Sequence, residues 1–136
     1  MKTSIKLNEN MHFTAMLDGF DISMDAASSV GGEEKGVKPK GLTLVSLAGC
    51  TGMDVISILR KMRAEPNDFS IDVEAETSDE HPRVYTRIKL IYRFKGGNIK
   101  KDKAEKAVQL SQEKYCGVSA MLKKAVQIEY EIVVEE

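Results

Sequence analysis

The 136-residue chain is short of cysteine and of excess charge. Two cysteines are too few for the disulfide framework of a small secreted domain. Twenty basic residues against twenty-one acidic ones leave a net charge of −1, which excludes the electrostatic footprint of a nucleic-acid or membrane-surface protein. What remains, 42% hydrophobic and 30% charged residues, excludes a disordered chain, because the apolar share can form a core.

Long hydrophobic runs are also scarce. The most apolar stretch, residues 42–59, is interrupted by polar residues and glycines, and Asp54 near its middle would be costly in lipid. We therefore expect a buried helix here rather than a membrane span. No apolar stretch follows the first six residues, so we expect no signal peptide and a cytoplasmic location. The length predicts a single domain over residues 1–136.

Hydrophobic periodicity predicts an α+β fold with a mostly antiparallel sheet and two long helices. Alternating residues indicate strands near 5–7, 11–17, 20–24, 67–77, 84–94 and 126–134, with Asp18-Gly19 as a hairpin turn. The segment 25–38 is rich in glycine and serine and favours an irregular loop. Helical spacing covers residues 40–63, and a second helix is predicted to begin at an Asp102/Glu105 cap.

The helix over residues 40–63 is apolar on nearly all sides. One small sheet covers only one side of such a helix. A second helix or a second subunit is therefore expected to cover the rest, which favours an oligomer.

The two cysteines are the candidate reactive groups. Cys50 and Cys116 occur one per predicted helix, and each has a glycine beside it, although glycine within a helix costs about 1 kcal/mol relative to alanine. One interpretation is that both are small buried hydrophobic residues. The other is a dithiol redox pair whose sulfurs face each other if the helices pack side by side.

The histidines, the lysine cluster and the paired glutamates are weaker candidates for a functional site. His12 and His81 lack the close paired spacing of a zinc site with the cysteines, so no metal is expected. The lysines near residues 100–106 are interpreted as a solvated helix start rather than a nucleic-acid site. Glu33 and Glu34 are interpreted as residues of a solvated loop, unless that loop folds over a site.

The segments around both cysteines resemble the OsmC/Ohr family of thiol-dependent organic hydroperoxide reductases, and its OsmC-like branch in particular. The matching blocks are PKGLTLVSLAGCTGMDV at residues 39–55 and LSQEKYCGVS at residues 110–119. The resemblance extends over nearly the whole chain. It implies an intertwined homodimer in which two central helices, one per subunit, lie between two sheets and two sites lie at the subunit interface.

The resemblance also implies an enzymatic activity. Cys50 matches the peroxidatic cysteine, which reduces an organic or fatty hydroperoxide to an alcohol and becomes a sulfenic acid. Cys116 matches the resolving cysteine, which condenses with it to a disulfide. A dithiol reductant, of lipoyl type in the family, resets the pair. The resemblance implies no cofactor and no metal.

Two family features are absent from this chain. Gly41 and Lys40 stand where the family carries a glutamate, and no arginine precedes Arg60. We therefore hypothesise that Lys40 supplies the positive charge near Cys50. The alternative functions are an OsmC-like protein of weak or no peroxidase activity that binds a lipid-like small molecule, or a redox sensor whose disulfide changes a partner contact.

Overall fold

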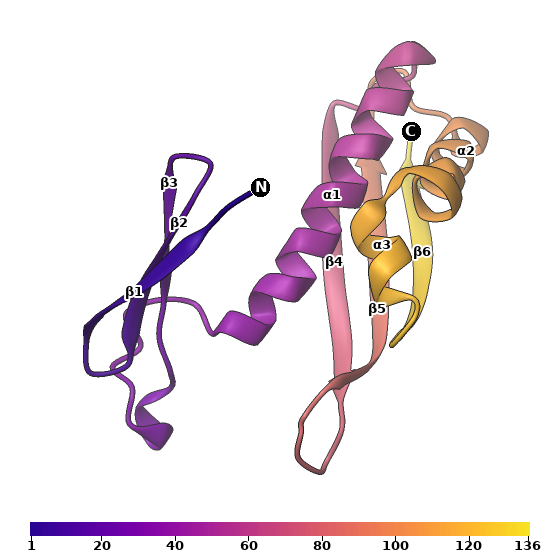
Figure 1. Cartoon of the computed structure of the whole chain (residues 1–136). Helices are drawn as coiled ribbons and strands as arrows, with labels where there is room; N and C mark the ends of the chain where they lie inside the picture. Colours follow the sequence, from indigo (N-terminus) through magenta and orange to yellow (C-terminus); the bar gives the residue numbers. More distant parts are fainter. The chain divides into compact units, whose positions relative to one another are not determined.

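The computed structural model describes residues 1–136 and confirms the α+β class. The elements are β1 (Ser4–Glu9), β2 (His12–Leu17), β3 (Phe20–Met24), η1 (Ser28–Val30), α1 (Pro39–Lys61), β4 (Asp68–Thr77), β5 (Tyr85–Lys95), α2 (Lys101–Leu110), η2 (Ser111–Tyr115), α3 (Gly117–Leu122) and β6 (Gln127–Glu135) (Figure 1). They form two compact units, Met1–Val45 and Ser46–Glu136, each described here by itself. A single domain over the whole chain stays a prediction.

The first unit is an antiparallel meander of order β1-β2-β3 (Figure 1). The Asp18-Gly19 hairpin is confirmed: both residues have positive φ, 52° and 82°, as a tight two-residue turn requires. The loop that follows β3 is more regular than predicted. It contains the 3-10 turn η1, and Val37 forms a parallel bridge with Met24.

The second unit contains a sheet of order β4-β5-β6 (Figure 1). β4 and β5 pair antiparallel, as predicted, whereas β5 and β6 pair parallel. The parallel pairing follows from the connection, because the chain crosses over through α2, η2 and α3 before it enters β6. Ion pairs join the charged faces of these strands. Arg87 of β5 contacts Glu76 of β4 and Glu129 of β6, and Arg93 of β5 lies 2.7 Å from Asp72 of β4.

Helix α1 begins at Pro39, where proline is favoured in a first turn. Its buried residues recur every four positions and define one face: Leu47, Thr51, Val55 and Leu59. On another face, Met53 is 74% exposed. By length and composition α1 is apolar enough to cross a membrane, and only 22% of its most apolar stretch is buried. The buried-helix interpretation stays a prediction.

The second predicted helix is divided in the structure into α2, η2 and α3. Lys100 rather than Asp102 is the N-cap residue of α2, and no side chain caps it. The helix then changes into the π-helical turn η2 and stops at Cys116, whose backbone is extended (φ −76°, ψ 105°). The Cys116 N–H donates to the Ser111 carbonyl at 2.8 Å, which closes the wider turn. Tyr115, the last residue of η2, is 53% exposed.

Candidate functional site

The structure brings the two cysteines together in the second unit. Cys50 comes from α1, and Cys116 lies between η2 and α3. Their Sγ atoms and a carboxylate oxygen of Asp54 all lie within 4.8 Å of one another. Both cysteines are free thiols; Cys116 is buried and Cys50 is half-buried. The separation is short enough for a disulfide to form after small side-chain rotations.

Backbone N–H groups at the start of α3 point at both sulfurs. The Ser119 N–H donates to Cys116 Sγ at 3.3 Å. The Val118 N–H donates to the Cys50 sulfur. Such donors favour the thiolate over the thiol, because they bond more strongly to a charged acceptor.

The surroundings of Cys50 nevertheless favour the thiol. Burial raises the pKa of the Cys50 thiol, the Val118 N–H lowers it, and the neighbouring Cys116 and Asp54 raise it further, so that the net pKa lies above the usual value. A reactive cysteine needs the opposite shift. Lys40 is not among these influences. The hypothesis that Lys40 activates Cys50 therefore stays a prediction.

A buried hydrogen-bond network lies beside the cysteines and links α1, β5 and η2. The hydroxyl of Thr51 lies 2.7 Å from both the Tyr92 hydroxyl and the Ser111 hydroxyl. Gln112 Nε2 donates to the Tyr92 oxygen at 2.9 Å and to the Thr51 oxygen at 3.2 Å. The network ends where Ser111 Oγ donates to Asp54 Oδ2 at 3.0 Å.

The proton positions in this network follow from its two ends. The Ser111 hydroxyl donates its proton to Asp54, so the Ser111 oxygen accepts from Thr51. Thr51 in turn accepts from Tyr92. Burial raises the pKa of Tyr92 to about 12, although its bonds with Thr51 and Gln112 lower it, so the phenol is neutral and donates. The hydroxyl groups of Tyr92, Thr51 and Ser111 thus each donate to the next group in this series of hydrogen bonds, which ends at Asp54.

Sequence reasoning missed the polar residues around the cysteines. Asp54 lies four residues after Cys50 on a helix, which places both side chains on one face. This spacing in the sequence could have indicated that Asp54 lies near Cys50. Ser111 and Gln112 are the first residues of the π-helical turn, and the periodicity of the sequence does not indicate this turn.

The glycines beside the cysteines do not share one explanation. A Cβ atom added at Gly49 or Gly117 would meet nothing within 4 Å, so neither allows close helix packing within this chain. A Cβ atom at Gly52 would lie 3.2 Å from Ile71 Cδ1 of β4. Close approach therefore explains Gly52 alone, against a strand rather than a helix.

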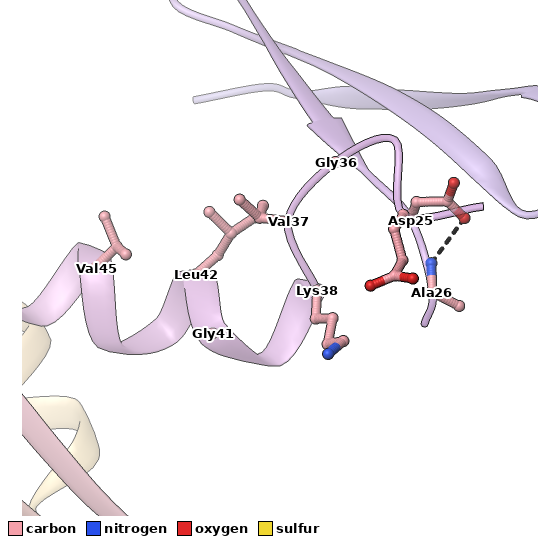
Figure 2. A pocket seen from close by; sticks show the side chains of 9 residues that line it. Asp25, Ala26, Gly36, Val37, Lys38, Gly41, Leu42 and Val45 are labelled. Carbon is pink, nitrogen blue, oxygen red and sulfur yellow. Dashed lines mark hydrogen bonds between the residues drawn. The ribbon is translucent and has the colours of Figure 1, made fainter. Parts of the chain in front are cut away.

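The loop after β3 forms a separate pocket in the first unit, with a volume of about 450 Å³ (Figure 2). The buried Asp25 organises it: its carboxylate accepts the N–H of Ala26 at 2.7 Å, of Glu33 at 3.3 Å and of Lys35 at 3.1 Å. Burial raises the pKa of Asp25, but these three bonds and the nearby His12 together outweigh it, and the net pKa is lowered. Glu34 lines this pocket and Glu33 pairs with Lys35 at 3.4 Å.

A second, apolar pocket of about 680 Å³ lies in the same unit. Ile5, Leu7, Phe13 and Met24 are among the residues that line it. The two histidines lie elsewhere: His12 hydrogen-bonds Ser23 Oγ at 2.7 Å within the meander, and His81 lies in the turn between β4 and β5.

Comparisons with known proteins identify the family. The chain matches the family described as OsmC-like protein over residues 32–131, and it belongs to that family. It is 36% identical to Protein YhfA of Escherichia coli K12 over 136 residues, with 98% of each chain covered. A hypothetical protein from Aquifex aeolicus is 34% identical, with a TM-score of 0.83 and 99% and 97% of the chains covered. The organic hydroperoxide resistance protein OhrB of Bacillus subtilis shares the fold at 20% identity, with a TM-score of 0.69 and 96% of each chain covered.

Proposed function

We propose that this protein is a cysteine-based peroxidase that reduces organic or fatty hydroperoxides to alcohols. The observation that carries the proposal is the pair of free thiols, Cys50 and Cys116, with sulfurs within 4.8 Å of each other in an OsmC-like chain. The family supports a redox role related to peroxides, since solved relatives of the same fold include organic hydroperoxide resistance proteins.

The reaction proceeds in three steps that use only thiol chemistry. The Cys50 thiolate attacks the distal peroxide oxygen, the O–O bond breaks, and the alkoxide leaves and takes a proton to become the alcohol. The Cys116 thiolate then attacks the Cys50 sulfenic sulfur, which forms the disulfide and releases hydroxide that is protonated to water. A dithiol of lipoyl type reduces the disulfide by two exchange steps and is itself oxidised to a cyclic disulfide.

The two cysteines differ in the way these roles require. Cys50 is the more exposed sulfur and is the one that meets the substrate. Cys116 is buried, and the Ser119 N–H holds its sulfur toward the site. A buried resolving thiol is protected from external oxidants, while a neighbouring sulfenic acid stays within its reach.

Activation of Cys50 requires a positive charge that the neighbours acting on its pKa do not supply. The protein is further proposed to act as a cytoplasmic homodimer, in which the exposed apolar face of α1 around Met53 is covered by a second copy. Light scattering is expected to give twice the 15.1 kDa chain mass.

Steady-state turnover tests the proposal. Reduced protein is supplied with excess dihydrolipoamide and cumene hydroperoxide, and alcohol formation is followed over many equivalents. We expect turnover by the wild type and its loss in both Cys50→Ser and Cys116→Ser. One oxidation event without further turnover would instead favour a redox sensor.

A second candidate function is the binding of an apolar, lipid-like molecule without catalysis. The apolar pocket of about 680 Å³ in the first unit favours it, since that volume suits a small ligand. Native mass spectrometry of the purified protein separates the two candidates. A co-purifying apolar ligand together with thiols that stay free in hydroperoxide would support the binding protein.

A further inference from the structure

The two sulfurs and the Asp54 carboxylate form a set of metal ligands as well as a redox pair. A tetrahedral zinc ion with Zn–S of about 2.3 Å and Zn–O of about 2.0 Å separates its ligand atoms by about 3.5 to 3.8 Å. The three ligand atoms here already lie within 4.8 Å of one another. Small side-chain rotations therefore suffice to place them around one ion.

The backbone fixes all three ligands without the metal. Cys50 and Asp54 are four residues apart on α1 and share one face. Cys116 is held through its own N–H, which bonds the Ser111 carbonyl at 2.8 Å, and through its sulfur, which accepts from the Ser119 N–H at 3.3 Å. N–H donors to sulfur stabilise thiolate ligands, because they share the negative charge.

A hydrogen bond holds one oxygen of the Asp54 carboxylate. Ser111 donates to one oxygen, Oδ2, at 3.0 Å, which leaves the second oxygen of Asp54 for an ion. Ser111 is itself held by Thr51 at 2.7 Å within the buried network. Supporting hydrogen bonds of this kind raise metal affinity, and their loss costs roughly 10- to 100-fold.

The charge of the cluster favours a divalent cation. Both thiols and the carboxylate are anionic when ionised, and their ligand atoms all lie within 4.8 Å of one another. Two thiolates select a soft or borderline metal of the zinc type and not calcium or magnesium, which take oxygen ligands. Three protein ligands leave a fourth position for water.

We propose that the reduced protein binds one divalent metal ion of the zinc type per chain through Cys50, Cys116 and Asp54. Each ion displaces two thiol protons to the solvent and forms two metal–sulfur bonds. The disulfide has no thiolate to offer, so oxidation of the pair releases the ion. The sequence-based expectation of no metal considered only the histidines as further ligands and did not include Asp54.

Cobalt and zinc titrations of the anaerobic, reduced protein test this site directly. Co²⁺ is expected to saturate at one ion per chain with thiolate-to-cobalt charge-transfer absorption, and Zn²⁺ is expected to displace it. Saturation at half an ion per chain, or the absence of thiolate absorption, would overturn the proposed ligand set.

Three variants and a matched control identify the ligands. Cys50→Ser and Asp54→Asn each remove one ligand and are expected to weaken binding by more than the roughly 10-fold loss predicted for Ser111→Ala, which only releases the carboxylate. Asp72→Asn removes an exposed carboxylate on β4 and is expected to bind as the wild type does. Unchanged affinity in Asp54→Asn would refute its role as a ligand.

A measurement on the wild type alone avoids any dependence on variant folding. Zn²⁺ is expected to slow the reaction of both thiols with 4,4′-dithiodipyridine, and the protein oxidised to the disulfide with diamide is expected to bind no Zn²⁺. Equal zinc binding by the oxidised protein would place the ion elsewhere and overturn the proposal. None of these readouts uses hydroperoxide, so the outcome is independent of peroxidase activity.

Discussion

Removal of the Asp54 charge is expected to make Cys50 more reactive, not less. Asparagine keeps an oxygen that accepts from Ser111, so Asp54→Asn removes the charge and preserves the hydrogen bond. In a Cys116→Ser background, Cys50 is the single thiol. The net effect of burial and of the neighbouring Cys116 and Asp54 is to hold the pKa of Cys50 above its usual value. The change therefore isolates the contribution of one of these neighbours.

The size of the effect follows from the separation of the two groups. The two groups lie at most 4.8 Å apart, and at that limit two unit charges repel by about 0.9 kcal/mol in water and by about 3.5 kcal/mol at an effective dielectric constant of 20. Cys50 is partly exposed, so the water-like value applies, and the thiolate population near neutral pH rises by about fivefold. A less basic thiolate is about twofold less nucleophilic, which leaves a net rate gain of about two- to threefold.

The assay is the stopped-flow reaction of both proteins with 4,4′-dithiodipyridine, a neutral disulfide, as a function of pH. The Asp54→Asn protein is expected to react faster near neutral pH. At a pH high enough to ionise Cys50 in both proteins, the Asp54→Asn protein should react more slowly than the protein with Asp54. Only the lower nucleophilicity of its thiolate then affects the rate. Asp72→Asn in the same background serves as the control. An equal or lower rate near neutral pH would refute the electrostatic reasoning.

Three further predictions concern stability and loop order. Thr51→Val deletes a buried hydroxyl that bonds Tyr92 and Ser111, so urea unfolding should show a loss of about 1 to 3 kcal/mol. Ser119→Ala deletes a buried hydroxyl whose oxygen has no partner, so the same assay should show no loss or a gain of up to about 1 kcal/mol. The bonds from the backbone lower the pKa of Asp25 in the folded protein. Asp25 therefore stabilises the loop at pH values above its unfolded-state pKa, and this stabilisation is lost as the pH falls through its folded-state pKa. Amide exchange of Glu33 and Lys35 should therefore be faster in Asp25→Asn than in the wild type at neutral pH, with the ratio falling toward one in acid; a ratio of one at neutral pH would contradict this role.

Much of the fold could be predicted from alternation in the sequence. The strands near 67–77 and 84–94 were predicted because their charged and apolar residues alternate, and the pairing of Arg93 with Asp72 confirms their outward charged faces. The parallel pairing of β5 with β6 could not be predicted, because the pattern of one strand carries no direction relative to its neighbour. The π-helical turn was missed because residues 111–115 continue the helical pattern of the preceding segment, and nothing in that pattern indicates a wider turn.

The sequence predicted the two cysteines of the candidate site but not the polar residues that surround them. Both cysteines stood out because they are the only two and because their neighbouring segments resemble the OsmC/Ohr family. Asp54 was considered only as an obstacle to a membrane span. Its proximity to both sulfurs depends on the position of Cys116, which the sequence alone does not fix because the turn η2 sets it.

The most direct test of the central claim is a single-turnover count of thiols. Reduced protein receives one equivalent of cumene hydroperoxide, is quenched with an alkylating agent within seconds, and is analysed by mass spectrometry beside Cys50→Ser. The account predicts that the wild type loses both thiols to an intramolecular Cys50–Cys116 disulfide and that the variant keeps its remaining thiol. Two free thiols in the wild type after hours of exposure would contradict the peroxidase function.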